Sequence, residues 1–254
     1  MESFLKFFGA ETIFTSLAGG ILPTLFWLKF WLREDRQHPE PPGMIVITFL
    51  AGMLAVAIAY PLERYVAALA LDESLVLLAL WALIEESAKF IMLAFVIFHS
   101  KEFDEPVDAI IYSISVALGF SALENALFLL DPISGGHYTQ ALILDNFRFI
   151  GATLLHVVSS ATIGIALGLV FFERGNVRYR AMTVGCIIAV TLHTAFNFSI
   201  MRSAGEHLYL IFGLLWLCVV VLLLLFERVK RVQPAPHVGH VEPPRPVIIF
   251  AKPS

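Results

Sequence analysis

Charged residues are scarce in this 254-residue chain, and cysteines are scarcer still. Only 15% of the residues are Asp, Glu, Lys or Arg, whereas 58% are hydrophobic and the mean hydropathy is +0.81. A soluble domain carries about 25% charged residues, so this composition excludes most soluble folds. The chain has no run of basic residues and its net charge is −4, which gives no reason to expect a nucleic-acid partner.

Two further signals are missing. The only cysteines, Cys186 and Cys218, both lie in apolar stretches, so we expect packing residues rather than a disulfide or a metal pair. The first ten residues contain Glu2 and a single basic residue, Lys6, and no small-residue cleavage site follows them. We therefore expect the first hydrophobic stretch to be retained instead of being removed as a signal peptide.

Long apolar stretches recur along the chain, separated by short polar connections. Because a bilayer span needs about 20 mostly apolar residues, we predict an all-α, polytopic transmembrane helical bundle of about seven spans. The predicted spans are 11–32, 43–62, 74–98, 107–130, 148–172, 181–201 and 207–226. Residues 1–231 form the membrane domain in this prediction. Residues 232–254 hold six of the 13 prolines and no helical period, which indicates a disordered, proline-rich tail.

The positions of Lys and Arg predict the orientation of these spans. One side of the bundle collects Arg33, Arg36, Lys101, Arg174, Arg178, Arg180, Arg228, Lys230 and Arg231. The other side has Lys6, Arg64, Arg148 and Arg202. Basic connections stay in the cytoplasm, so we predict an N-terminus outside, a cytoplasmic C-terminus, and a multi-pass location in the cell membrane.

Several ionisable or amide side chains lie inside the predicted spans. They are Glu85, Glu86 and Lys89 in the third span, Glu124 and Asn125 in the fourth, His156 in the fifth, and His193 and Asn197 in the sixth. A charged side chain at the centre of a span costs about 2.5–3.5 kcal/mol on insertion scales. Each of these residues therefore needs a partner or a function.

Residue counts predict that the ionisable side chains share one depth. At 1.5 Å per residue, Glu85 and Glu86 lie about 15 Å below the outer surface, Glu124 about 10 Å, His156 about 12 Å and His193 about 13 Å. Carboxylates and imidazoles at one level on four helices are typical of a single polar site in a bundle core.

Helical spacing adds detail to this site. Lys89 follows Glu85 by four residues and Glu86 by three, so it can neutralise whichever carboxylate turns away from the reacting centre. His193 and Asn197 share a helix face, so an imidazole and an amide can approach one substrate carbonyl together. Taken alone, Asn197 is more often an interhelical hydrogen-bond partner, and a Glu–Lys pair can be structural. A structural pair leaves the remaining carboxylate and both histidines unexplained.

In this order, these residues resemble the PrsW family of intramembrane proteases, a branch of the larger group that includes CAAX prenyl endopeptidases. The resemblance rests on EESAK at 85–89, EPVDAIIY at 105–112, FSALEN at 120–125, His156 and HTAFN at 193–197, and it covers roughly residues 20–200. It implies that Glu85 and Glu86 are catalytic carboxylates and that Glu124 and His156 complete the centre. His193 and Asn197 match the last motif, with Lys89 and Asn125 in supporting places.

The resemblance also implies a substrate class. This chain departs from the CAAX pattern, which has a histidine at the position of Glu124 and an arginine one residue beyond Lys89, and this argues against prenylated substrates. PrsW-type relatives are implied to cleave membrane-anchored anti-sigma factors. The expected partners are thus a single-span membrane protein and the lipid bilayer.

Two mechanisms fit these residues. In the first, Glu124, His156 and His193 hold Zn²⁺ and leave an open position for a water that Glu85 or Glu86 deprotonates. In the second, which needs no metal, a glutamate and His156 activate the water while His193 and Asn197 stabilise the oxyanion. A different class of function, an ion- or proton-coupled transporter, would use the same buried groups. We see no inverted repeat and no pair of broken spans in its favour.

Overall fold

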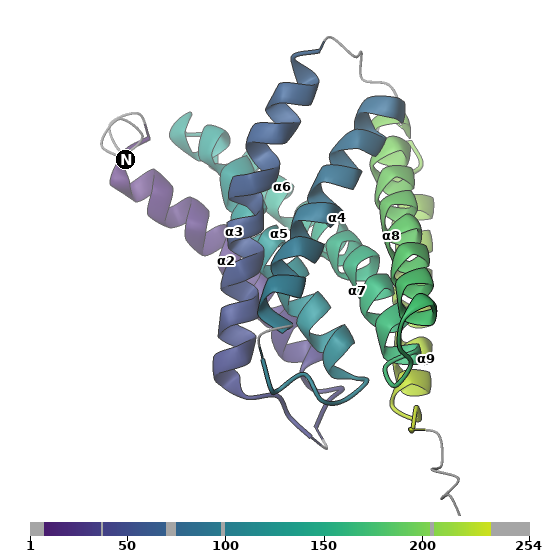
Figure 1. Ribbon diagram of the computed structural model, residues 1–254. Coiled ribbons are helices and arrows are strands. Elements are labelled where there is room, and N and C mark those ends of the chain that lie inside the picture. The colour runs from purple at the N-terminus through teal and green to yellow at the C-terminus, as the bar shows by residue number, and fades with distance from the viewer. Residues whose placement is uncertain (1–7, 37, 70–74, 98–99, 204–205, 235–254) are drawn as a thin grey trace, which may run out of the picture.

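The computed structural model describes residues 8–36, 38–69, 75–97, 100–203 and 206–234, and within these ranges the chain is helical with no strand. The helices are α2 (Ala10–Trp31), α3 (Pro42–Ala67), α4 (Leu75–Ile97), α5 (Asp108–Ser134), α6 (Tyr138–Phe147), the π-helix η1 (Arg148–Ala152), α7 (Thr153–Leu169), α8 (Asn176–Ser203) and α9 (Leu208–Val229), as Figure 1 shows. The predicted all-α class is confirmed.

Each predicted span coincides with a long helix to within a few residues, the fifth being formed by η1 and α7 together. Six helical segments in the described ranges are long and apolar enough to cross a membrane, with α6, η1 and α7 counted as one. Helix α4 is outside this set because Glu85, Glu86 and Lys89 lie in its middle. Its 23 residues match a bilayer and these three side chains are buried in the bundle, so α4 serves as the seventh span.

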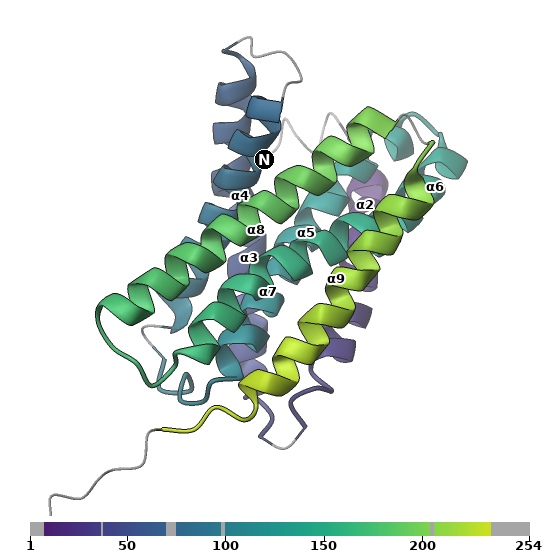
Figure 2. The same ribbon diagram turned by 90° about the vertical axis from the view of Figure 1, so that its right-hand side faces the viewer.

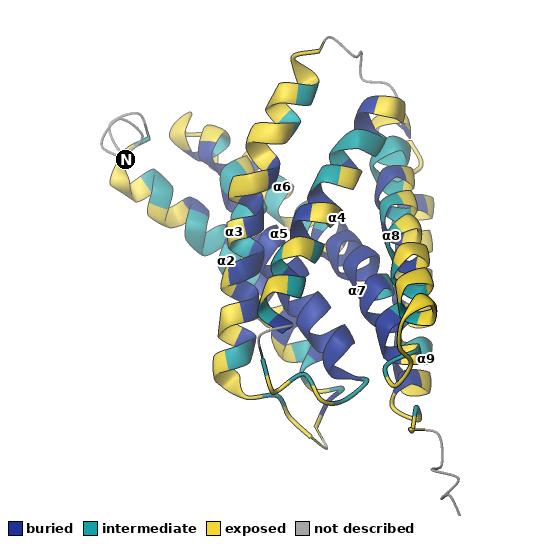
Figure 3. Ribbon diagram, viewed as in Figure 1, coloured by how far each residue is buried: buried dark blue, intermediate teal, exposed yellow. Residues whose placement is uncertain are grey.

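Helix α5 is the centre of the bundle. It is buried over most of its length and packs most extensively against α2, α3 and α7; it and α7 are the darkest helices of Figure 3. Its approach to α3 depends on two glycines, because a Cβ at Gly119 would overlap the carbonyl oxygen of Phe49 and one at Gly52 would overlap that of Val116. Small residues permit such backbone contact between membrane helices, and it leaves α5 firmly placed as a platform for the site.

The outer helices expose apolar side chains. Phe95 on α4, Ile187 on α8 and Leu224 on α9 are each at least 60% exposed, and similar residues cover the outward faces of α2 and α3. Figure 2 shows α8 and α9 in front of α7, where they complete the bundle. An apolar exterior around a partly polar interior is the arrangement that a bilayer favours.

Helix α6 and the π-helix after it were not predicted. The ten residues of α6 are too short for a span and include Thr139, Asp145 and Asn146, so span-length hydropathy gave no signal for them. A π-helix inserts one residue into a helical turn and has no hydropathy signature. It allows the chain to pass directly from α6 into α7.

The ends of the helices alternate as the prediction requires. The ends of α2, α4, α7 and α9 and the starts of α3, α5 and α8 lie at one end of the bundle, and the end of α3 and the start of α4 lie at the other (Figure 1). Which end faces the cytoplasm stays a prediction. Of the predicted tail, residues 235–254 lie outside the described residues.

Candidate active site

Four helices bring the predicted polar side chains together in the bundle core. Glu85, Glu86 and Lys89 are at most 6% exposed on α4, and His156 and His193 are 2% and 1% exposed on α7 and α8. On α4 these residues occupy positions i, i+1 and i+4, which turns all three toward the interior side of the helix. The predicted convergence of carboxylates and imidazoles is therefore present.

Lys89 lies at the middle of the cluster. Its Nζ donates to Glu86 Oε1 at 2.9 Å and to Glu85 Oε2 at 3.4 Å. The same Nζ is 2.7 Å from His156 Nδ1, and it lies 4.1 Å from the ring centroid of Phe120. The predicted contact between Lys89 and both carboxylates is thus observed, and the histidine contact adds an acceptor from α7.

Glu86 is the more tightly held of the two adjacent glutamates. Besides Lys89, its Oε1 accepts from His193 Nδ1 at 2.9 Å and its Oε2 accepts from the Ser160 hydroxyl at 2.8 Å. Glu85 has one hydrogen bond, the long one from Lys89. The predicted division of labour between the two follows from these contacts, because Glu86 is fixed by three donors while Glu85 is free to bind something else.

Each histidine has one ring nitrogen, called its outer nitrogen, that contacts a carboxylate. His156 Nε2 is 3.0 Å from Glu124 Oε2, and His193 Nδ1 contacts Glu86. These contacts assign a proton to Nε2 of His156 and to Nδ1 of His193. The other nitrogen of each ring then carries a lone pair.

Glu85 lies near both of these nitrogens, and Lys89 Nζ lies closer to one of them, 2.7 Å from His156 Nδ1. Glu85 Oε2 is 3.7 Å from His156 Nδ1 and 3.8 Å from His193 Nε2. Ligand atoms of these three residues all lie within 4.8 Å of one another, the one such group among the described residues that can hold a metal ion. Two imidazoles and a carboxylate are ligands that Zn²⁺ prefers, and a carboxylate behind each imidazole is the usual outer support.

Glu124 occupies a different place from the one expected of a ligand. It is 20% exposed at its side chain and lies behind His156, where it also forms an ion pair with Arg148. The predicted set of Glu124, His156 and His193 stays a prediction. The geometry supports a set in which Glu85 replaces Glu124.

The two predicted amides have different surroundings. Asn197 is half-buried one turn beyond His193, and no hydrogen bond of its side chain occurs within the described part of the chain. Asn125 is 1% exposed and donates to Ser121 and Thr153 at 3.2 and 3.1 Å. Asn125 thus belongs to the packing behind the centre, and a catalytic role for Asn197 stays a prediction.

Sequence reasoning missed Arg148 as a site residue. It stood at the flank of a predicted span and was counted only for orientation. The π-helix brings its side chain inward, where Nε donates to Asn125 Oδ1 at 2.6 Å and a terminal nitrogen contacts Glu124. A basic residue at the start of a mostly apolar span was the signal available.

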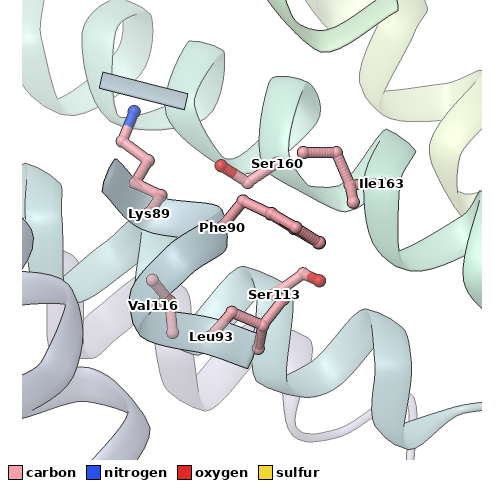
Figure 4. Close-up of a pocket in the computed structure, with 7 residues that line it drawn as sticks. All are labelled: Lys89, Phe90, Leu93, Ser113, Val116, Ser160 and Ile163. Atoms are coloured by element: carbon pink, nitrogen blue, oxygen red, sulfur yellow. The ribbon is translucent and has the colours of Figure 1, made fainter. Parts of the chain in front are cut away.

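Glu124 and Arg148 are the more exposed side chains of the site, at 20% and 13%. Beside Lys89 is a void of about 10 Å³, shown in Figure 4, which is lined by side chains of α4, α5 and α7. The Lys89 ammonium points away from this void. About one water molecule fits in such a space, so this void is too small to hold a peptide.

The site has more carboxylates than cationic side chains. Glu63 on α3 is near enough to interact with Glu85 and Glu124, so the centre has four carboxylates. Lys89 and Arg148 supply two positive charges. Buried charge is costly unless it is neutralised, so the carboxylates in excess of these two cations must be protonated or bind a cation.

A second acidic group lies at the opposite end of the bundle. Burial raises the pKa of Asp35 to about 6, with Asp108 and Glu105 adding to the effect. Burial, followed by a hydrogen bond with Asp108, raises the pKa of Glu40 to about 9. Asp35 and Glu40 are remote from the two histidines, so we expect their protonation to affect the stability of the fold and not the chemistry of the site.

A helical membrane bundle with buried glutamates and histidines around one centre has the arrangement of an intramembrane hydrolase. The chain belongs to the PrsW family of intramembrane metalloproteases, whose family model matches residues 40–226. It is therefore an intramembrane protease, as the resemblance implied, and a multi-pass membrane protein.

Curated relatives agree with this assignment. "Protease PrsW" of Bacillus subtilis is 26% identical over 201 residues, covering 78% of this chain and 87% of the relative. The protein of the same name from Geobacillus kaustophilus is 34% identical over 165 residues, covering 63% and 66%. That of Oceanobacillus iheyensis is 28% identical over 220 residues, covering 85% and 94%. No solved structure matches the chain.

Proposed function

We propose that this protease hydrolyses a peptide bond of a single-span membrane protein at a centre formed by Glu85, His156 and His193. The observation that supports it most is that two imidazoles, each contacting a carboxylate through one ring nitrogen, have their other nitrogen within 3.8 Å of one loosely held glutamate. A transporter would need no such arrangement. The family assignment also favours proteolysis over transport.

A divalent metal, Zn²⁺ in this proposal, fits the residues present. Glu85, His156 and His193 would hold it, and when bound it supplies a Lewis acid that lowers the pKa of water. Glu86 keeps His193 in the required tautomer and Lys89 balances the charge of Glu86. Glu124 does the same for the tautomer of His156.

The metal-free mechanism uses the same groups differently. Glu85, whose carboxylate has only the 3.4 Å hydrogen bond from Lys89, would then take the proton of the attacking water, with the His156 imidazole beside it. The 2.7 Å contact of Lys89 with His156 Nδ1 supports this version, because it occupies the lone pair that a metal would use. In both versions Asn197 donates to the carbonyl oxygen as negative charge develops there.

We further propose an anti-sigma factor as the substrate, cleaved within the outer half of the bilayer. The substrate would approach past Glu124 and Arg148, the more exposed part of the centre.

The experiment combines cleavage with metal analysis. Purified full-length protein in liposomes is mixed with single-span anti-sigma factors, beside Glu85→Gln and the control Glu206→Gln, which changes an exposed glutamate outside the site. We expect wild type and Glu206→Gln to cleave, Glu85→Gln to be inactive, and one equivalent of zinc in the active protein. Cleavage by Glu85→Gln at the wild-type rate would refute the proposed centre. Activity that survives complete removal of metal would select the metal-free mechanism.

A further inference from the structure

Arg148 is the one cation of the site that lies outside the recognised motifs. It belongs to η1, where the helix has an extra residue in its turn. Such π-helical turns are frequent at functional sites because they redirect a side chain that a regular helix would place elsewhere. Arg148 is 13% exposed at its side chain, so most of its guanidinium is withdrawn from the surroundings.

The guanidinium holds two groups on α5 at once. Its Nε donates to Asn125 Oδ1 at 2.6 Å, and a terminal nitrogen forms the ion pair with Glu124 Oε2. Asn125 cannot rotate away, because its amide also donates to Ser121 and Thr153. The planar fork of Arg148 is therefore anchored on one side by a fixed amide and directed on the other at the carboxylate.

Glu124 transmits this constraint to His156. The oxygen that Arg148 contacts, Oε2, is also the one 3.0 Å from His156 Nε2. An ionised carboxylate accepts and does not donate, so this contact keeps the proton on Nε2 and the lone pair on Nδ1, toward Glu85. Lys89 Nζ, 2.7 Å from Nδ1, favours the same tautomer from the other side of the ring. If Glu124 turned away, Lys89 alone would favour it, and part of the population could carry the proton on Nδ1.

We infer that Arg148 is a positioning residue of this protease: it fixes Glu124 so that His156 presents Nδ1 to the reacting centre. The role rests on the proposed function, and it holds with or without a metal because both mechanisms place the His156 imidazole beside Glu85 in a fixed orientation. Support of this kind behind a ligand or base is worth roughly 10–100-fold in activity or metal affinity.

Cleavage kinetics give the first test. Arg148→Ala in the full-length protein is compared with the control Arg202→Ala, which removes a cation from the end of α8 that lies over Phe198. We expect kcat to fall roughly 10–100-fold for Arg148→Ala with KM within about twofold, and no change for the control. Millimolar methylguanidinium should restore activity to Arg148→Ala in a saturable way, because it can enter the partly exposed space of the missing side chain. A kcat within about twofold of wild type, or a loss that methylguanidinium does not restore, would overturn the inference.

The histidine tautomer gives a second test that needs no cleavage. NMR of protein with isotope-labelled histidine, assigned by subtracting the spectrum of His156→Gln, shows which ring nitrogen is protonated. We expect Nε2–H in wild type and a mixture of both tautomers in Arg148→Ala. Pure Nε2–H in the variant would refute the role of Arg148 even if no substrate is ever cleaved. If Arg148→Ala does not fold, Arg148→Lys replaces it in both tests, because an ammonium keeps the charge but cannot hold both partners.

Discussion

Glu86 and Glu85 are adjacent in sequence, yet their replacement by glutamine should have different effects on stability. Glu86 is 2% exposed and accepts hydrogen bonds from Lys89, His193 and Ser160, whereas Glu85 accepts one, at 3.4 Å. Removing one partner of a buried ion pair costs roughly 3–5 kcal/mol, because the other charge is left without compensation. Glu85 would still neutralise part of the Lys89 charge, so we expect about 2–4 kcal/mol for Glu86→Gln.

This difference can be measured by thermal unfolding in detergent. For a chain of this size 1 kcal/mol corresponds to roughly 2–4 °C, so the Tm of Glu86→Gln should fall by roughly 5–15 °C. Glu85→Gln should lower the Tm by less than Glu86→Gln does, because its ion pair with Lys89 is the longer of the two and Glu86 still neutralises the ammonium, while it abolishes cleavage. Glu86→Gln should retain some activity at low temperature. Equal Tm losses in the two variants, or wild-type stability in Glu86→Gln, would refute the assignment of Glu86 as the structural carboxylate.

Three further outcomes are expected. Gly119→Ala should destabilise the protein by about 1–3 kcal/mol or more, because the added methyl would overlap a backbone carbonyl of α3. Gly213→Ala has open space around it and should raise the stability by about 0.5–1 kcal/mol. Equal Tm shifts in the two variants would contradict this packing of α5 against α3. The pKa of Glu40 is raised to about 9 in the folded chain, so its contribution to stability is present at acid pH and is lost as the pH rises from about 4.5 through 9. The decline of the Tm over this pH range should therefore be smaller in Glu40→Gln than in the wild type. A decline of the same size in both proteins would exclude this carboxyl as its source. A reporter fused after Arg231 should report a cytoplasmic location, and a reporter inserted within residues 135–137 should report an outside location. The reverse pattern would invert the topology and move the site to the cytoplasmic half of the bilayer.

The sequence determined the spans and predicted that a group of buried carboxylates and imidazoles would come together. Seven apolar stretches of bilayer length predicted the long helices to within a few residues, because the cost of exposing a backbone to lipid makes hydropathy a strong constraint. The residue count along each span also predicted that the polar groups share one level. Glu85, Glu86, Lys89, His156 and His193 do converge.

Only the tertiary structure decided how these groups divide the work. The orientation of each helix about its own axis, set by close packing at positions such as Gly119, determines which oxygen meets which nitrogen. Glu85 thus faces both imidazoles while Glu124 lies behind one of them, a difference that spacing along single helices cannot reveal. The π-helix that turns Arg148 inward depends on contacts with α5, and no local pattern in the sequence announces it.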